Sequence, residues 1–377
     1  MTYLTDRREK LPSTGNDMGS VSRKASWLQA AVGTMSQSKR VRRYLGRPYL
    51  RMNMWIWNHL PASLTSSRLG STYGAHLHRL IQFRSERKPY MGTFFFRNRP
   101  ELELLTRLLD ARRQGSTLDL TILGCSKGAE VYSFLYSIRS ARPDLSVRLR
   151  ALDIESEVVE LAKEGVYYLK NRPPEQNSNL GALTPGGDLA SRTFGDQRTW
   201  VFERMPPDEI AAMFECEGQQ ATVKPRFREG ITWHIGDAGD PKLADVFGLQ
   251  DIVVANRFLC HMQPNDAETC LRNLSGLVKP GGYLFVSGVD LGVRSKVARE
   301  LGWTPVTELI HEIHEGDPSL RKDWPLQYWG LEPFDRRRSD WSTRYASVFQ
   351  LGKASSEAAP TTVVGGNPEQ MLVHDHN

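Results

Sequence analysis

The sequence has 377 residues, 40% of them hydrophobic, and its 49 Lys and Arg against 43 Asp and Glu give a formal net charge of +6. A chain of this length can bury one large core and an accessory domain. It has no apolar run long enough to span a bilayer and no apolar signal core near the N-terminus, which argues against a membrane-spanning or secreted protein. Its four cysteines lack metal-ligand spacing, which favours a cytoplasmic protein with reduced thiols.

The basic charge is concentrated near the N-terminus. Eleven Lys and Arg residues lie from Arg7 to Arg51, interleaved with Tyr and Trp. Such a segment is typical of a helical accessory region whose aromatic side chains pack against the rest of the protein. It could also contact an anionic membrane surface, whereas nucleic acid is the disfavoured partner. We therefore predict a disordered stretch at 1–25 and a helical accessory region at 26–89, in a protein that is cytoplasmic or peripheral at the inner membrane surface.

The middle of the chain begins with a nucleoside-binding pattern. The apolar run 120–123 predicts a strand that leads through a small-residue turn into a helix at 129–140. A second predicted strand, 146–152, ends at Asp153, whose carboxylate can accept hydrogen bonds from both hydroxyls of a ribose. The turn holds only two glycines and lacks the dinucleotide pattern, which favours a nucleoside without phosphates, and S-adenosylmethionine is the commonest such cofactor on this architecture.

Further strands alternate with helices downstream, which indicates a parallel sheet. They are predicted at 231–235, 251–255 and 283–287, with helices around His261 and at 271–278. The strand 231–235 ends in Gly236-Asp237-Ala238, where an acidic side chain and a backbone N–H could contact the amino edge of an adenine.

The rest of the chain gives weaker signals. The interval 171–228 is rich in Pro, Gly, Asn and Gln and is interpreted as an inserted subdomain or a lid, with a strand at 198–202. A helix at 294–301, a strand or helix at 306–314 and a last strand at 344–351 are predicted before a flexible tail at 352–377. Between these elements, aromatic residues lie among arginines and form either core or the wall of an acceptor pocket. They are Trp324, Tyr328, Trp329, Phe334 and Trp341. No third ligand accompanies His311 and His314, so no metal site is predicted.

Four motifs, in order, resemble those of the CheR-type chemotaxis receptor methyltransferases. They are Thr93-Phe94-Phe95-Phe96-Arg97, the segment from Gly124 to Ser133, Ala151-Leu152-Asp153-Ile154, and the segment from Lys279 to Phe285. The resemblance covers roughly residues 90 to 288. It implies a class I methyltransferase domain at 90–351, with a Rossmann-like, mostly parallel α/β sheet of seven strands, helices on both faces and a small inserted subdomain. It also implies S-adenosylmethionine as cofactor and S-adenosylhomocysteine as product.

The resemblance also implies roles for individual residues. By position, Arg97 and Glu130 would contact the cofactor, Asp153 would bind its ribose, and Asp237 and Ala238 would lie beside its adenine. The other predicted contacts are Thr93, Gly124, Cys125, Ser126 and Ile154 of the same motifs, and Asn256 and Arg257 after the fourth strand. Arg97 is in addition a candidate catalytic residue.

After the fourth strand the chain departs from the family. Asn256-Arg257 reverses the family's Arg-Asn order, and His261 stands where the family has a tyrosine. A hydroxyl nucleophile must lose a proton as it attacks, and an imidazole can accept it. We therefore hypothesise that His261 is a general base and that the acceptor is a hydroxyl of a small molecule or glycan. Two alternatives remain, a glutamate side chain of a protein and a non-catalytic scaffold that binds the cofactor.

Overall fold

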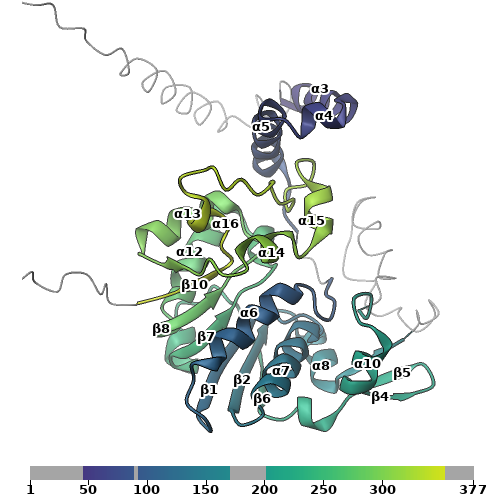
Figure 1. Ribbon diagram of the computed structural model, residues 1–377, viewed down its shortest axis with the longest axis vertical. Coiled ribbons are helices and arrows are strands. Elements are labelled where there is room, and N and C mark those ends of the chain that lie inside the picture. The colour runs from purple at the N-terminus through teal and green to yellow at the C-terminus, as the bar shows by residue number, and fades with distance from the viewer. Residues whose placement is uncertain (1–45, 89–91, 170–200, 353–377) are drawn as a thin grey trace, which may run out of the picture. The chain divides into compact units, whose positions relative to one another are not determined.

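The computed structural model describes residues 46–88, 92–169 and 201–352, which fall into two units (Figure 1). The helical unit consists, in its described part, of residues 46–86 and 319–333. The sheet unit consists of residues 87–318 and the chain from Phe334 onward. The segment 319–333, which the sequence placed in the methyltransferase domain, thus joins the N-terminal helices. The predictions for 1–25 and for all but the first residue of the tail lie outside the described residues.

The helical unit is built on two packed helices. Its elements are α3 (Gly46–His59), α4 (Ala62–Thr65) and α5 (Arg68–Arg84), with α15 (Pro318–Asp323) at the edge of the returning segment. Buried Leu77 and Ile81 of α5 pack with Tyr328, and Trp57 of α3 meets the ring of Trp324 edge-on. The aromatic residues at 324–329 are therefore core of this unit. None of the helices in 46–88, 92–169 and 201–352 is long and apolar enough to cross a membrane.

The sheet unit contains the predicted mostly parallel sheet of seven strands. The strand order is β6-β2-β1-β7-β8-β10-β9, and only β10 pairs antiparallel to its neighbours. The strands are β1 (Thr117–Leu123), β2 (Ser146–Asp153), β6 (Ile231–Ile235), β7 (Gln250–Val254), β8 (Val278–Phe285), β9 (Thr304–Pro305) and β10 (Val348–Gln350). This order confirms the Rossmann-like architecture.

Helices cover both faces of the sheet (Figure 1). They are α6 (Arg99–Asp110), α7 (Ala129–Ala141), α8 (Ser156–Glu164), α11 (Leu243–Phe247), α12 (Pro264–Ser275), α13 (Leu291–Glu300), α14 (Ile310–Glu315) and α16 (Trp341–Tyr345). Alternate residues of each central strand belong to separate cores, as the two-residue period of a strand requires. Ile252 and Val254 join the core under α6 and α7, whereas Val253 joins the one under α12 and α13.

A small antiparallel sheet is inserted after α8. Its strands are β3 (Val166–Tyr168), β4 (Phe214–Glu217) and β5 (Gln220–Val223), in the order β3-β5-β4, and α10 (Pro207–Met213) leads into it. A small subdomain is thus present, but β3 precedes the predicted range 171–228, of which residues 171–200 lie outside the described residues. The strand predicted at 198–202 lies largely outside the described residues, and its last two residues, 201 and 202, form a turn.

Three predicted elements differ from the structure. The helix predicted at 271–278 is α12, which ends at Ser275, because residues 276 and 277 form a turn and Val278 already belongs to β8. The helix expected to carry His261 is one 3-10 turn, η4 (Leu259–His261), and Pro264 starts a new helix. The last strand is only β10, and the first part of its predicted range is α16.

Candidate functional site

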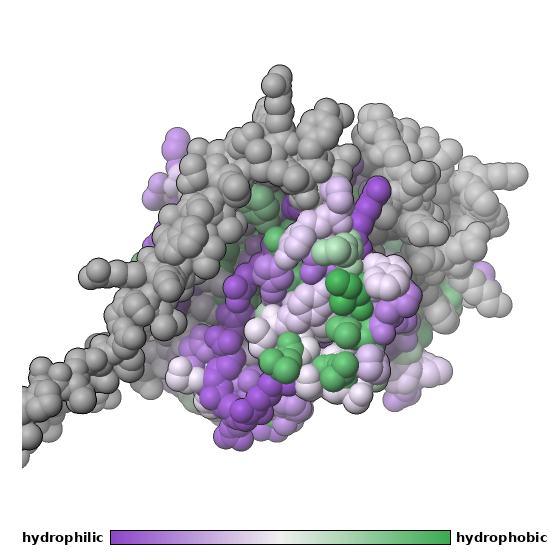
Figure 2. Space-filling view, turned by 90° about the horizontal axis from the view of Figure 1, so that it is seen from above, coloured by the Kyte–Doolittle hydropathy of each residue, from purple (hydrophilic) through white to green (hydrophobic). Residues whose placement is uncertain are grey.

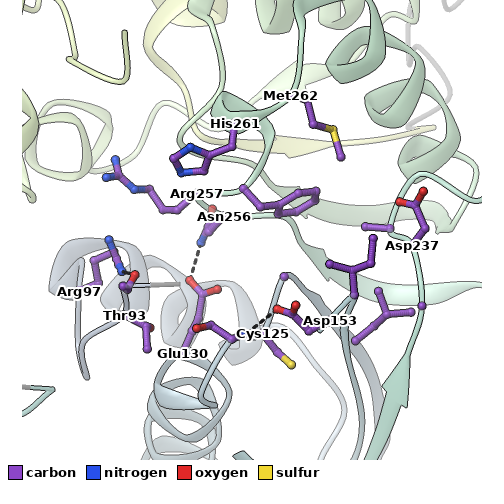
Figure 3. A pocket seen from close by; sticks show the side chains of 18 residues that line it. Thr93, Arg97, Cys125, Glu130, Asp153, Asp237, Asn256, Arg257, His261 and Met262 are labelled. Atoms are coloured by element: carbon purple, nitrogen blue, oxygen red, sulfur yellow. Dashed lines mark hydrogen bonds between the residues drawn. The ribbon is translucent and has the colours of Figure 1, made fainter. Parts of the chain in front are cut away.

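A pocket of about 220 Å³ opens at the carboxyl ends of β1, β2, β6 and β7 (Figure 3). Ligands of open parallel sheets bind at this edge, outside the ends of the strands. All residues predicted for the site line the pocket, which are Thr93, Arg97, Gly124, Cys125, Ser126, Glu130, Asp153, Ile154, Asp237, Ala238, Asn256, Arg257 and His261. The structure brings them together, and their individual roles remain predictions.

The turn after β1 approaches the pocket so closely that it requires glycine. Gly124 has a φ of +67°, and a Cβ there would lie 2.8 Å from Cδ1 of Phe258. Such a φ is costly for other residues, and the approach leaves no room for a methyl group. The backbone N–H of Cys125 donates to the carbonyl of Leu152 at 3.1 Å, which holds the turn against the end of β2.

Asp153 stands at one end of the pocket. Its carboxylate is buried and accepts hydrogen bonds from the backbone N–H groups of Ser126, at 2.7 Å, and Glu155, at 3.2 Å. These bonds fix the carboxylate at the end of β2, where it fits a ribose. The neighbouring Ile154 is 60% exposed and supplies apolar surface at the same end. Asp237 lies across the pocket in Figure 3, and its side chain accepts from the backbone N–H of Gly239 at 2.8 Å.

A pair of buried carboxyl groups stands at the other end. The side-chain amide of Asn256 donates to Oε1 of Glu101, at 2.6 Å, and to Oε1 of Glu130, at 2.9 Å. Burial raises the pKa of Glu130, and burial together with the charge of Glu130 raises the pKa of Glu101 to about 8. When two buried carboxyl groups lie close together at one amide, ionisation of the second is costly because it places two negative charges side by side. Glu101 is therefore mostly protonated near neutral pH.

Glu101 escaped the sequence analysis. It lies in the first turn of α6, and its backbone N–H donates to Oδ1 of the capping residue Asn98. An acidic residue there is common on purely structural grounds, because it complements the helix dipole. Only the fold, which brings α6 next to the segment after β7, reveals its contact with the site.

Two arginines give this end positive charge. Arg97 donates to the carbonyl of Gly92 at 2.7 Å, and its guanidinium lies 4.6 Å from the centre of the Phe94 ring. Burial, with the charge of Arg257, lowers the pKa of Arg97 to about 10, so it stays protonated at neutral pH. Nε and Nη1 of Arg257 are buried, and neither has a hydrogen-bond partner within the described residues. Arg257 also has a φ of +68°, an uncommon conformation for a side chain of this size.

His261 lines the pocket beside these arginines. Burial, followed by the charges of Arg257, Arg87 and Arg97, lowers its pKa to about 4. Arg87, which the sequence analysis did not select, holds the turn that carries the histidine. Its guanidinium donates to the carbonyls of Cys260 and Met262 at 3.1 and 2.9 Å, and it pairs with Asp290 at 2.7 Å. The imidazole is therefore neutral at physiological pH.

The remaining candidates lie elsewhere. His311 and His314 both meet the ring of Phe334 edge-on, and Phe334 and Trp341 pack on the core under α12 and α13. None of the aromatic residues at 324–341 that were considered for an acceptor pocket lines this one. In the described ranges, no group of three His, Cys, Asp or Glu is arranged to hold a metal ion.

Two family models match consecutive parts of the chain, and one relative matches about half of it. The family model of the CheR methyltransferase S-adenosylmethionine binding domain matches residues 92–174, and that of a methyltransferase domain matches residues 208–286. An uncharacterised 104.1 kDa protein of Rhodobacter capsulatus is 26% identical over 208 residues, which is 52% of this chain. The match spans only 18% of that longer protein.

Two solved structures show weaker likeness. Magnesium protoporphyrin IX methyltransferase from Synechocystis is 13% identical, with a TM-score of 0.29 over 55% of this chain and 69% of that one. PKMT2 from Rickettsia typhi is 14% identical, with a TM-score of 0.27 over 52% and 25%. Likeness at these TM-scores carries no argument about the family of this chain. The order of the strands, the residues of the pocket and the first family model agree, and the chain therefore contains an S-adenosylmethionine-binding domain of the CheR methyltransferase type on a class I methyltransferase fold.

Proposed function

We propose that the protein transfers the methyl group of S-adenosylmethionine to a carboxylate oxygen. The observation that carries this proposal is the pair Arg97 and Arg257 at the end of the pocket beside His261, far from Asp153 in Figure 3. A guanidinium with unsatisfied donors binds a carboxylate strongly and with defined geometry. The two guanidiniums suit two carboxylates, that of the cofactor's methionine and that of the acceptor.

The residues present fit the cofactor. In this proposal Asp153 binds the ribose, Ile154 covers the adenine, and Glu130 receives the positive charge of the methionine ammonium, and all three residues line the pocket. When bound, S-adenosylmethionine supplies a methyl group made electrophilic by its positively charged sulfur. The chain's contribution is to position the acceptor in line with that group and to exclude water, which provides much of the rate.

A carboxylate acceptor needs no base. It is already ionised at neutral pH, so its oxygen attacks the methyl carbon while the carbon–sulfur bond breaks and its electron pair stays on sulfur. No proton is transferred. This matches the surroundings of His261, because a pKa of about 4 makes its imidazole a weak proton acceptor. A glutamate of a protein is the carboxylate that the CheR resemblance favours.

A hydroxyl of a small molecule or glycan is the second candidate. The observation in its favour is that His261 lines the pocket and is unprotonated at neutral pH, as a base must be. Its low pKa weighs against it, because a general base works best when its pKa is near the working pH. A scaffold that binds the cofactor without turnover is the third possibility, and the same experiments distinguish it.

The test begins with calorimetric titration of the whole protein with S-adenosylhomocysteine, with Asp153→Ala as the control that should not bind. Methyl-labelled S-adenosylmethionine is then incubated with the protein and with separated protein and small-molecule fractions of a cell extract. Label that mild alkali releases as methanol identifies a methyl ester and supports the carboxylate. Alkali-stable label indicates a hydroxyl or another acceptor and overturns it. Cofactor binding without label transfer supports the scaffold.

A further inference from the structure

We propose that the helical unit docks on an anionic membrane surface through the outward face of α3. This face is defined by Met52 and Trp55, which are 51% and 62% exposed, and is bordered by Tyr49, whose hydroxyl forms a hydrogen bond with Nε2 of His76 in α5 at 3.3 Å. Spacings of three residues place them within one third of the helix circumference. The proposal is independent of the methyl acceptor and rests on the helical unit alone.

The opposite face of α3 is already occupied. Asn53 is buried and accepts a hydrogen bond from the hydroxyl of Tyr73 at 2.8 Å, and Trp57 meets the rings of Tyr73 and Trp324. The inward side of the helix is thus satisfied by α5 and by the returning segment. An outward face is normally polar. Trp55 and Met52 therefore expose apolar surface that the packing of the unit does not explain.

The basic charge of the helical unit indicates which kind of partner fits this face. From residue 18 to residue 85 the sequence contains eleven Lys and Arg and neither Asp nor Glu. In the described part of this range, Arg51, Arg68 and Arg79 are exposed. Basic side chains around a bilayer-facing helix are attracted to anionic headgroups, and the attraction acts over about a Debye length.

The apolar residues select a lipid surface over a nucleic acid. Trp and Tyr prefer the headgroup level of a bilayer, and an interfacial helix places its apolar side chains at the boundary with the acyl chains. Trp55 stacks on His59 with ring centroids 4.2 Å apart, yet remains the most exposed aromatic residue of α3. Met52, next to it on the same face, can enter a lipid layer but has no ring to stack on a base.

Figure 2 shows one face of the molecule, on which hydrophobic residues, in green, lie side by side with hydrophilic ones, in purple. Leu64 of α4 and Leu69 of α5 are also exposed, at 51% and 84%. The helical unit thus offers apolar and basic surface together, which is the combination that a peripheral membrane protein needs.

The test is sedimentation of the whole protein with two kinds of vesicle, pure phosphatidylcholine and phosphatidylcholine with about one third phosphatidylglycerol. We expect binding to the anionic vesicles alone, with an affinity that falls as salt is added. The double substitution Met52→Ser with Trp55→Ser should weaken this binding at least about tenfold, because both side chains lose apolar contact. Val246→Ser is the matched control, since Val246 is a 70% exposed apolar residue of the sheet unit.

Several outcomes would overturn the proposal. They are a failure to bind anionic vesicles, equal binding to both kinds of vesicle, and binding that the double substitution leaves unchanged. A single-stranded oligonucleotide is tested in parallel. Retention of the oligonucleotide, with no sedimentation on vesicles, would assign the basic face to nucleic acid instead. Thermal unfolding of the double variant at the wild-type temperature shows that lost binding is not lost folding.

Discussion

Glu101 and Glu130 meet at one amide nitrogen, that of Asn256, at 2.6 and 2.9 Å. The carbonyl oxygen of the same amide accepts the backbone N–H of Ser287 at 2.9 Å, which fixes the orientation of the amide. Three segments far apart in the sequence, α6, α7 and the turn after β7, are therefore tied together at the charged end of the pocket. The reversed Asn-Arg order at 256 and 257 has a structural use, because it places the amide between two acids and the arginine beside His261.

The first prediction concerns Glu101→Gln. The pKa of Glu101 is about 8 in the folded protein, above its ordinary value, so the unfolded chain releases this proton at lower pH than the folded chain does. The stability that the group contributes is present below the unfolded pKa and is lost as the pH rises through the folded pKa. Glu101→Gln should remove this loss. Its free energy of unfolding should therefore gain on wild type between about pH 5 and about pH 8, by at most about 1.4 kcal/mol per pH unit.

Urea unfolding across this pH range measures the difference. Glu103→Gln is the control, because Glu103 is an exposed glutamate of the same helix. A difference between Glu101→Gln and wild type that stays constant with pH would show that Glu101 is ionised in the folded protein, contrary to this account.

The second prediction concerns Gly124→Ala. The φ of +67° and the 2.8 Å approach to Phe258 both oppose a side chain here. We expect a loss of about 1 to 3 kcal/mol in stability and weaker binding of S-adenosylhomocysteine, since the turn must move. Gly248→Ala separates the two causes, because Gly248 has a φ of +68° with open space around it. If both substitutions had the same effect on binding, the close approach at Gly124 would have no role in the site.

Much of the fold could be predicted from the sequence. Strand 231–235 was predicted with its bounds, and β1, β2 and β7 were located because buried parallel strands are short apolar runs ended by small or polar residues. The boundary between α12 and β8 could not be placed. The apolar residues Leu274, Leu277 and Val278 continue helical spacing into the strand, and periodicity alone does not separate adjacent buried elements.

The residues that line the pocket could be predicted from the sequence, whereas the charged residues that contact them from distant segments could not. The pocket residues follow strand ends in order, so local motifs were enough to find them. Glu101 and Arg87 act through contacts more than a hundred residues away in the sequence, and nothing local distinguishes them from ordinary helix and loop charges. The pKa of His261 depends on the same long-range contacts, which explains why its base role looked stronger in the sequence than it does in the structure.

The third prediction concerns the pH dependence of cofactor binding. Burial raises the pKa of Glu130, so its carboxylate is lost at a higher pH than that of an exposed glutamate. If the ionised form receives the methionine ammonium, affinity for S-adenosylhomocysteine should fall as the medium is acidified through that pKa, by up to about tenfold per unit. Glu130→Gln should bind weakly at every pH. Calorimetric titration at a series of pH values checks this, and a pH profile shared by wild type and Glu130→Gln would remove Glu130 from the role.

The fourth prediction concerns His261→Ala. Loss of a general base lowers turnover by about a hundredfold to ten-thousandfold. With a carboxylate acceptor, which needs no base, we expect a loss below about tenfold that does not change with pH between about 6 and about 8. Single-turnover kinetics with saturating cofactor gives the number. A loss above a hundredfold, with unchanged binding of S-adenosylhomocysteine, would instead support the hydroxyl acceptor.

The last prediction concerns Arg257→Met. Nε and Nη1 of Arg257 are buried without hydrogen-bond partners in the described residues, so the guanidinium costs stability where it stands. Met keeps the length of the side chain and is no better or worse suited to the φ of +68°. We therefore expect the free energy of unfolding to stay the same or rise, while methyl transfer to the carboxylate falls at least about tenfold through a higher KM for the acceptor. The pKa of His261, followed by NMR, should rise because one of the charges that lower it is gone. A residue that merely supports the fold would behave in the opposite way, with lower stability and an unchanged KM. Because stability and KM move in different directions under the two accounts, this one variant separates a binding arginine from a structural one.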